Sequence, residues 1–243
     1  MTLGMDASPV FSEMCRASFT SDEITKKMIY FYLTTYAEDN PDLAIMAVNT
    51  FQKDCKHSSS KIRGLALRNL CSFRSSDYIN NVLPTIRELL TDFEPYVKKT
   101  AIMGLLKVFY HDPAVIYSII KNNTDDEGII NTLSNLIRDS DSLVSVNAIM
   151  CLNEILVSEG GIPLTSKLVK YLYGRLKEYN GWEQSEILEI LYKYDPRDEK
   201  EHYEIMSLLW EKLKLSSTSL VLSSIRIIIK LAKQKQDLFS SVV

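Results

Sequence analysis

Apolar residues recur along this chain at the spacing of amphipathic helices, and the predicted helices group into pairs. A branched or aromatic apolar residue opens the second helix of each pair, and these anchors are Ile24, Ile62, Val97, Val144, Trp182 and Val221. Successive anchors lie 38, 35, 47, 38 and 39 residues apart. A period of about forty residues is typical of HEAT and armadillo solenoids. The pattern predicts an all-α solenoid, a superhelix of about six helical pairs.

The predicted second helices share a local pattern: a polar capping stretch, the anchor, and a small residue four positions later. That small residue is an alanine in three repeats: Ala66, Ala101 and Ala148. A small side chain one turn past the anchor allows two helices to approach closely. The last two repeats carry Glu186 and Ile225 instead. The last two repeats have therefore drifted from the pattern.

Two helices near the N-terminus have faces that can be read from the sequence. In the helix predicted to end at Ala37, the face expected to pack comprises Ile24, Met28, Phe31 and Tyr32. The next helix begins near Pro41, which is tolerated in a first turn. Its expected inward face comprises Leu43, Ala44, Ala47 and Phe51.

The polar linkers are short, which bears on the number of domains. The clearest breaks are residues 122–128 and 158–163, and neither is long enough to separate independent domains. We therefore interpret residues 1–243 as a single domain. Its last helix and residues 238–243 remain apolar, although the terminal repeats of a solenoid need polar surfaces. We expect the chain to be a piece of a longer superhelix or to be covered there by another chain.

Composition and charge exclude several classes of function. The net charge of −3 gives no footprint for general nucleic-acid binding. The four cysteines form no CxxC pair, and the three histidines have no metal-ligand or nucleophile neighbour at a useful spacing. No glycine-rich phosphate loop is present. We expect no catalytic residues, no metal and no cofactor. The start lacks the pattern of a signal peptide and no run is long enough to span a bilayer, so we expect a cytoplasmic protein.

Four segments resemble the β-adaptins, the β-type large subunits of adaptor complexes. They are residues 26–33 (KKMIYFYL), 41–51 (PDLAIMAVNTF), 62–68 (IRGLALR) and 95–101 (PYVKKTA). Trp182 and Gln184 resemble the family's Trp-Gly-Gln segment, with Glu183 in place of the glycine. Gly64 stands where the endocytic and Golgi-clathrin β chains more usually have alanine, which favours the branch of the fourth adaptor complex. The resemblance is strongest over residues 26–101 and becomes weaker after residue 122.

The resemblance implies a scaffold rather than an enzyme. β-Adaptins form heterotetramers with a second large chain, a medium chain and a small chain, and these complexes select cargo for coated vesicles. For this chain it implies the N-terminal trunk, peripheral on trans-Golgi network or endosomal membranes. It also implies binding to an Arf-family GTPase in its GTP form. No partner role for nucleic acid is implied.

The family's GTPase contact falls at Ile45 and Val48, which are three residues apart and are expected to share a helix face. The alternative is that both pack on the neighbouring repeat, as apolar helix positions usually do. The only Lys-Lys pairs of the chain, Lys26-Lys27 and Lys98-Lys99, are candidates for contact with anionic lipid or an acidic partner. Their alternative is an ordinary solvated face.

Other HEAT scaffolds remain alternatives at this point. A coatomer large subunit or a nuclear transport receptor would share the helical pattern, although the charge of −3 is small for a transport receptor. A phosphatase scaffold subunit usually has more regular repeats than the 35 to 47 residues found here.

Overall fold

The computed structural model describes residues 6–73, 76–122, 128–214 and 217–240, and every regular element in these ranges is helical. The predicted all-α solenoid class is therefore confirmed. The chain forms two compact units, Met1–Leu136 and Ile137–Val243, which are described separately below. Within the described ranges, no helix combines the length and the apolarity needed to cross a membrane.

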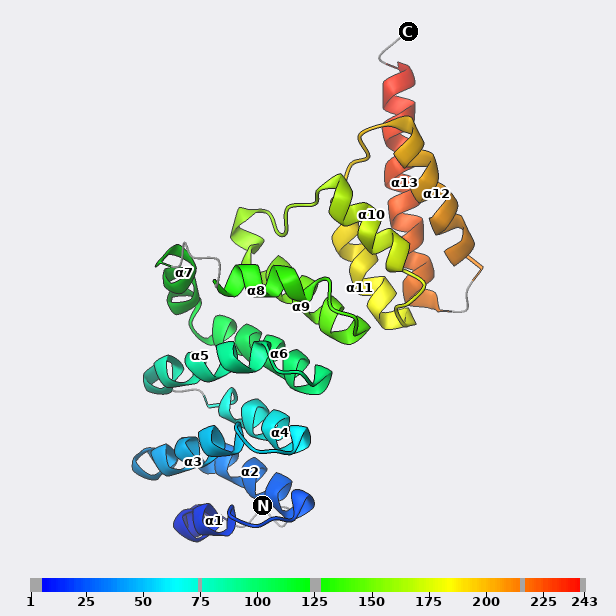
Figure 1. Ribbon diagram of the computed structural model, residues 1–243. Coiled ribbons are helices and arrows are strands. Elements are labelled where there is room, and N and C mark those ends of the chain that lie inside the picture. The colour runs from blue at the N-terminus through cyan, green and yellow to red at the C-terminus, as the bar shows by residue number, and fades with distance from the viewer. Residues whose placement is uncertain (1–5, 74–75, 123–127, 215–216, 241–243) are drawn as a thin grey trace. The chain divides into compact units, whose positions relative to one another are not determined.

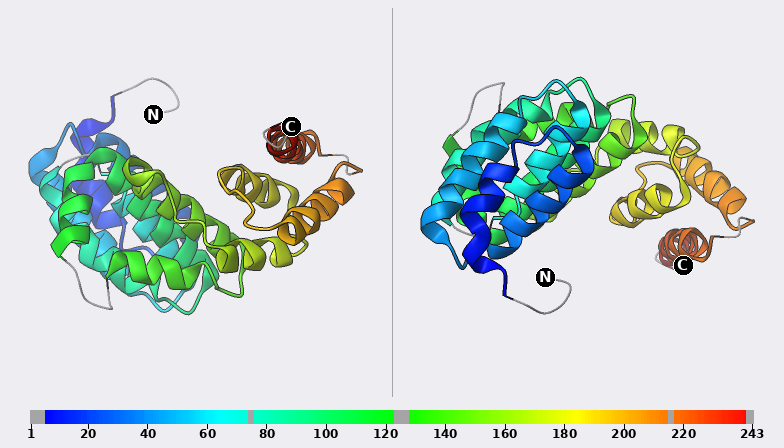
Figure 2. Two further views of the ribbon diagram at one scale, coloured as in Figure 1. Left: turned by 90° about the horizontal axis from the view of Figure 1, so that it is seen from above. Right: turned by 90° about the horizontal axis from the view of Figure 1, so that it is seen from below.

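The helices of the first unit follow one another in a layered stack (Figure 1). In chain order they are η1 (Ser8–Val10, a 3-10 helix), α1 (Phe11–Ala17), α2 (Glu23–Tyr36), α3 (Pro41–Asp54), α4 (Ser60–Leu70), α5 (Ser76–Leu90), α6 (Pro95–His111), α7 (Pro113–Asn122) and α8 (Ile129–Leu136). Helix α4 contacts α2, α3 and α6, and α5 contacts α6. The second helices of three successive pairs, α2, α4 and α6, thus form one layer. Figure 2 shows the ribbon from above and from below, where the successive helices of the first unit overlap.

The second unit continues the pairing. Its elements are α9 (Ser142–Ile155), η2 (Val157–Glu159, a 3-10 helix), α10 (Ser166–Arg175), α11 (Gly181–Leu191), α12 (Glu199–Lys212) and α13 (Thr218–Ser240). Helix α11 packs against α9 and α13, and α12 packs against α13. Helix α11 is therefore packed between the second helices of both neighbouring repeats, which is how a solenoid builds its core.

The long interval between the third and fourth anchors has a structural cause. It contains two helices, α7 and α8, where the other intervals contain one first helix of a pair. The polar stretch 122–128, which the sequence suggested as the origin of the 47-residue spacing, lies mostly outside the described residues. The additional helix α7 by itself accounts for a longer repeat.

Three of the six anchors occupy the core. Ile62, Val97 and Val144 are buried, and so are the alanines one turn later, Ala66, Ala101 and Ala148. The other three anchors lie in the first turns of their helices but outside the core: Ile24 and Trp182 are exposed, and Val221 is half-buried. The first buried side chains of their helices are instead Lys26, Glu183 and Leu220. The expected inward face of α2 is wrong in part, because Met28 and Phe31 are exposed and only Tyr32 is buried.

Helix capping explains the register of α11. The Asn180 side chain accepts a hydrogen bond from the Glu183 backbone nitrogen (3.0 Å), and the Glu183 carboxylate accepts one from the Asn180 backbone nitrogen (2.8 Å). This reciprocal capping box satisfies two backbone donors at the helix start. It turns Glu183 inward and leaves Trp182 on the outer side of the first turn. The glutamate that departs from the family's Trp-Gly-Gln segment therefore has a structural role.

Helices α4 and α6 approach closely at Gly104. A Cβ atom at this position would lie 2.7 Å from the sulfur of buried Cys71. That separation is shorter than van der Waals contact, so the absence of a side chain permits the helix spacing. Gly174 in α10 is also helical, but it is exposed and a Cβ there would meet nothing within 4 Å.

We expect Gly104→Ala to lower the free energy of unfolding by about 1 kcal/mol or more, because overpacking costs about 1–3 kcal/mol and outweighs the helical propensity gained. Gly174→Ala is the matched control and should raise it by about 0.5–1 kcal/mol. Adding Cys71→Ala to Gly104→Ala should recover part of the loss. Urea unfolding of the three variants checks this, and equal stabilisation by both glycine substitutions would contradict it.

A buried carboxylate organises the turn between α11 and α12. Glu201 accepts hydrogen bonds from the Ser166 hydroxyl (2.7 Å), the Tyr194 hydroxyl (2.9 Å) and the Arg197 backbone nitrogen (3.0 Å). Burial alone would raise the pKa of Glu201. The hydrogen bonds from Arg197, Ser166 and Tyr194 outweigh burial, so the pKa is lowered from its usual value.

A carboxyl group with a lowered pKa in the folded state stabilises that state above its unfolded pKa of about 4.3 and loses this contribution as the pH falls further. Glu201→Gln should therefore reduce the free energy of unfolding by about 1–3 kcal/mol at pH 7. The difference from the parent chain should shrink toward pH 3. Urea unfolding at both pH values tests this, with exposed Glu204→Gln as the control. A constant difference across this range would count against the argument.

Candidate partner-binding surface

The GTPase contact expected on α3 is only half exposed. The side chain of Ile45 is 51% exposed, whereas Val48 is 2% exposed and belongs to the core. Positions three apart lie about 60° apart around a helix axis, and here the edge of the buried face runs between them. The prediction that Ile45 and Val48 form one exposed pair is therefore wrong for Val48. The expected inward residues Ala44, Ala47 and Phe51 are buried, and Leu43 is half-buried.

The exposed apolar neighbour of Ile45 is Met46, which the sequence analysis missed. Asp42 and Asn49 are also exposed on this helix. The outer face of α3 thus combines a small apolar spot with polar surroundings. Met46 lies outside the helical spacing shared by Ala44, Ala47 and Val48, which are buried. That spacing is the sequence signal that could have placed Met46 on the outer face.

The first lysine pair is divided between the core and the surface. Lys26 is 5% exposed, and its ammonium lies 2.5 Å from a carboxylate oxygen of Asp54 at the end of α3. The Tyr30 hydroxyl donates to the same carboxylate. Lys26 therefore cannot contact a membrane or an acidic partner as predicted, because its charge is already neutralised inside the unit. Lys27 is exposed and remains a candidate.

The second lysine pair lies near the start of α6, where both side chains are half-buried. The Lys99 ammonium lies over the Tyr96 ring, 5.7 Å from its centroid. The structure does not bring Lys98 and Lys99 into the same pocket as Lys27.

A second buried ion pair repeats the arrangement of Lys26. The Arg63 guanidinium binds Asp92 through two bonds of 2.8 and 2.9 Å, and it donates to the carbonyl oxygens of His57 (3.0 Å) and Ser58 (2.9 Å). Asp92 also accepts from the Glu94 backbone nitrogen (2.9 Å). The rigid planar guanidinium can donate in several directions at once. Arg63 therefore links the turn before α4 to the turn before α6.

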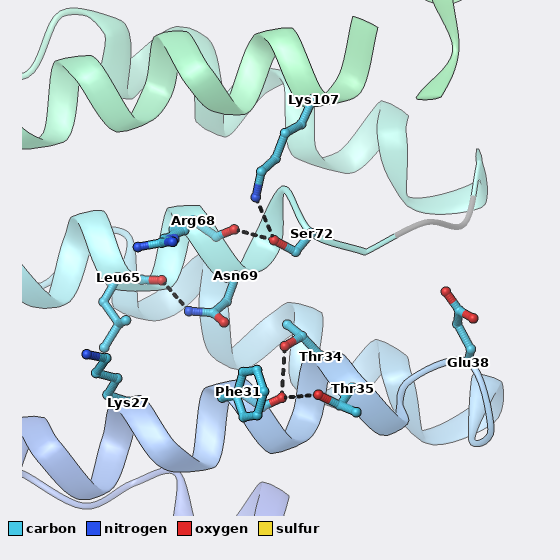
Figure 3. A pocket seen from close by; sticks show the side chains of 10 residues that line it. All are labelled: Lys27, Phe31, Thr34, Thr35, Glu38, Leu65, Arg68, Asn69, Ser72 and Lys107. Carbon is cyan, nitrogen blue, oxygen red and sulfur yellow. Dashed lines mark hydrogen bonds between the residues drawn. The ribbon is translucent and has the colours of Figure 1, made fainter. Parts of the chain in front are cut away.

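The layer formed by α2, α4 and α6 contains a hollow of about 660 Å³, which we call the α2–α4–α6 groove. It is lined by Lys27, Phe31, Thr34, Thr35, Glu38, Leu65, Arg68, Asn69, Ser72 and Lys107 (Figure 3). The sequence analysis did not predict it, since its residues come from three helices that lie far apart along the chain. Part of its wall is fixed by local hydrogen bonds, such as that from the Asn69 amide to the Leu65 carbonyl (2.7 Å).

The groove has an excess of positive charge. Lys27, Arg68 and Lys107 contribute cations from three different helices, and Glu38 contributes the single carboxylate of its lining. The Lys107 ammonium donates to the Ser72 hydroxyl at 2.9 Å. Partial desolvation lowers the pKa of Lys107, and the positive charge of Arg68 acts in the same direction, against the effect of Cys71. An anion bound here would favour the charged form of Lys107 and so oppose the effects of desolvation and of Arg68.

The described surfaces combine apolar, cationic and polar side chains. Among the described residues, no group of three or more histidine, cysteine, aspartate or glutamate side chains could hold a metal ion. The four cysteines are buried free thiols. Apolar helix faces, a cationic groove and buried ion pairs between repeats together define a helical-repeat scaffold.

Comparisons with known proteins identify the family. The model of the Adaptin N terminal region matches residues 1–243, so this chain belongs to the adaptin family. It is 37% identical over 234 residues to the mouse AP-4 complex subunit beta-1, covering 96% of this chain and 31% of that protein. It is 38% identical over 242 residues to the AP-4 complex subunit beta of Dictyostelium discoideum, covering 100% of this chain and 28% of that protein. The chain thus spans less than a third of these relatives.

One structural neighbour supports the fold alone. A chain in a homology model of the full-length AP-3 complex has a TM-score of 0.63 and 18% identity, covering 98% of this chain and 40% of that chain. The expected β-adaptin resemblance is confirmed by the relatives, and the helical fold agrees with this neighbour.

Removing one partner of the Lys26–Asp54 pair should be strongly destabilising. Asp54→Ala leaves a buried, unpaired ammonium, so we expect the free energy of unfolding to fall by about 3–5 kcal/mol. Adding Lys26→Met should recover part of this loss because no buried charge then remains. The control is Lys56→Ala, which breaks the exposed contact with Glu88 (3.7 Å) and should cost less than about 1 kcal/mol. Similar losses in urea unfolding for Asp54→Ala and Lys56→Ala would contradict this reading.

Proposed function

We propose that this chain is a trunk segment of the β-type large subunit of an adaptor complex that sorts cargo at the trans-Golgi network or endosomes. The observation that carries the proposal is the match to the Adaptin N terminal region along all 243 residues, together with AP-4 β relatives over nearly the whole chain. The role is a non-catalytic scaffold, in which repeated helices present surfaces to other chains. Residues 1–243 would act as one continuous part of the trunk.

The proposed partners are a second large chain, a medium chain and a small chain. Peripheral attachment to the cytoplasmic side of the membrane would come through the assembled complex, with Lys27, Lys98 and Lys99 as candidates for acidic contacts. The burial and ion pairing of Lys26 argue for a separate, structural role for that residue.

Recruitment to the membrane would use the outer face of α3. An Arf-type GTPase in its GTP form would contact exposed Ile45, and Met46 beside it would extend the apolar contact. Val48 would act indirectly, by holding α3 against the core. A small, solvent-facing apolar pair on a well-packed helix is preformed for such a contact, so little conformational entropy is lost when the partner binds.

Ile45→Asp should remove GTP-dependent capture of this chain by an Arf-family GTPase, because it places an uncompensated charge in an apolar contact. We expect at least about a tenfold loss of binding, equivalent to about 1.4 kcal/mol. The measurement is a pull-down with immobilised GTPase loaded with a GTP analogue or with GDP.

Two variants make this test specific. Val157→Asp introduces the same charge at an exposed valine of the second unit and should leave capture unchanged. Val48→Ala truncates a buried side chain and should lower the unfolding midpoint rather than remove nucleotide dependence. Equal capture in both nucleotide states, or equal loss with Val157→Asp, would reject the α3 contact.

A further inference from the structure

The α2–α4–α6 groove gathers positive charge in a chain whose net charge is −3. Among the described residues, no carboxylate lies within ion-pair distance of Lys27, Arg68 or Lys107. By contrast, the buried cations Lys26 and Arg63 on two of the same helices each have an aspartate partner. Within the described part of the chain, the groove cations therefore have no carboxylate partner of their own, and an anion supplied from outside the chain would pair with them.

The groove also offers apolar surface. The Phe31 ring is exposed, and Leu65 lines the groove beside Arg68. Met28 continues the exposed apolar line along α2, one turn before Phe31 on the same side of the helix. Figure 3 shows Phe31 below Asn69, with Lys27 and Arg68 to one side and Lys107 above. An occupant that matched this surface would carry both negative charge and apolar groups.

The dimensions favour an extended chain over a compact anion. Packed helix axes are about 8–10 Å apart, so a ligand reaching from α2 across α4 to α6 spans about 16–20 Å. About six residues of extended polypeptide cover that distance. A phosphate or inositol headgroup would use some of the cations but would leave the Phe31 ring and Leu65 without a partner. Thr34, Thr35 and Asn69 already donate to backbone carbonyls of their own helices, so their side-chain oxygens remain as acceptors for backbone N–H groups of an extended segment.

We propose that the α2–α4–α6 groove binds an extended acidic segment of a partner protein, in which carboxylates face Lys27, Arg68 and Lys107 and an apolar side chain contacts Phe31 and Leu65. This contact lies on different helices from Ile45 and does not depend on the GTPase contact. The groove is then a second docking surface, independent of α3. Because salt screens the attraction between charges, the affinity of this contact falls as the salt concentration rises.

The test is fluorescence anisotropy with the full chain and a fluorescein-labelled peptide of six glutamates, one leucine and one phenylalanine. The comparison peptide has glutamine in place of every glutamate. We expect saturable binding of the acidic peptide, weakened at least tenfold by Lys27→Ala/Arg68→Ala/Lys107→Ala and about as much by raising the salt from 50 mM to 500 mM. Phe31→Ser should weaken binding by a smaller factor.

The matched control removes three exposed lysines from the second unit: Lys167→Ala/Lys170→Ala/Lys177→Ala. It changes the net charge by the same amount and should leave the affinity within about twofold. Ile45→Asp should also leave it unchanged, which separates this proposal from the GTPase contact. Circular dichroism of each variant confirms that it is folded.

Three results would overturn the proposal. The first is no binding of the acidic peptide, or equal binding of the glutamine peptide. The second is an equal loss of affinity in both triple variants, which would indicate a non-specific charge effect. The third is binding of inositol hexakisphosphate, abolished by the groove triple, without binding of the acidic peptide. That outcome would assign the cations to a compact phosphate ligand instead of a protein segment.

Discussion

A polar residue at the fourth position of the second helices α2, α4, α6, α9 and α11 is the constraint on which the stacking of these repeats depends. Counted from the helix caps, that position holds Lys26, Arg63, Lys98, Ser145 and Gln184. Arg63 and Ser145 each bind the turn before their own helix and a group of the next repeat, Asp92 and Tyr179. Burying such groups is costly unless every donor is satisfied. The spacing between repeats must therefore bring both partners within hydrogen-bond distance. Apolar packing alone would tolerate small shifts of one repeat against the next.

The helical pairing could be predicted from the sequence, whereas the faces of individual helices could not always be. Pairing follows from polar turns and apolar periodicity, which are local features. In α2, however, apolar residues cover more than one side, and the side with Ile29 and Leu33 is buried while the side with Met28 and Phe31 is exposed. Choosing a large apolar residue as the anchor of α2 predicted the wrong side of this helix to be buried. The residue buried in its first turn is a charged lysine, whose aspartate partner is 28 residues away.

The same limit applies to the candidate surfaces. The family resemblance directs the expected GTPase contact to α3, but exposure is decided by the neighbouring helices, and these bury Val48 while leaving Ile45 in solvent. The groove could not be predicted from a local sequence pattern, because its successive cations are about forty residues apart in the chain. Only the stacking of α2, α4 and α6 brings them together. The repeat period that defines the fold also sets the spacing of these charges, so a surface of this kind arises from the architecture as well as from composition.

The burial of the cysteines has a practical consequence for studying the two units. All four thiols are enclosed, and burial raises the pKa of Cys71 and of Cys151 to about 12. Thiolate is the form that reacts with alkylating reagents, so these side chains are protected both by access and by protonation. Cys15, Cys55 and Cys71 belong to the first unit and Cys151 to the second. Alkylation followed by peptide mass spectrometry would therefore time the opening of each unit separately, without introducing any label into the native chain.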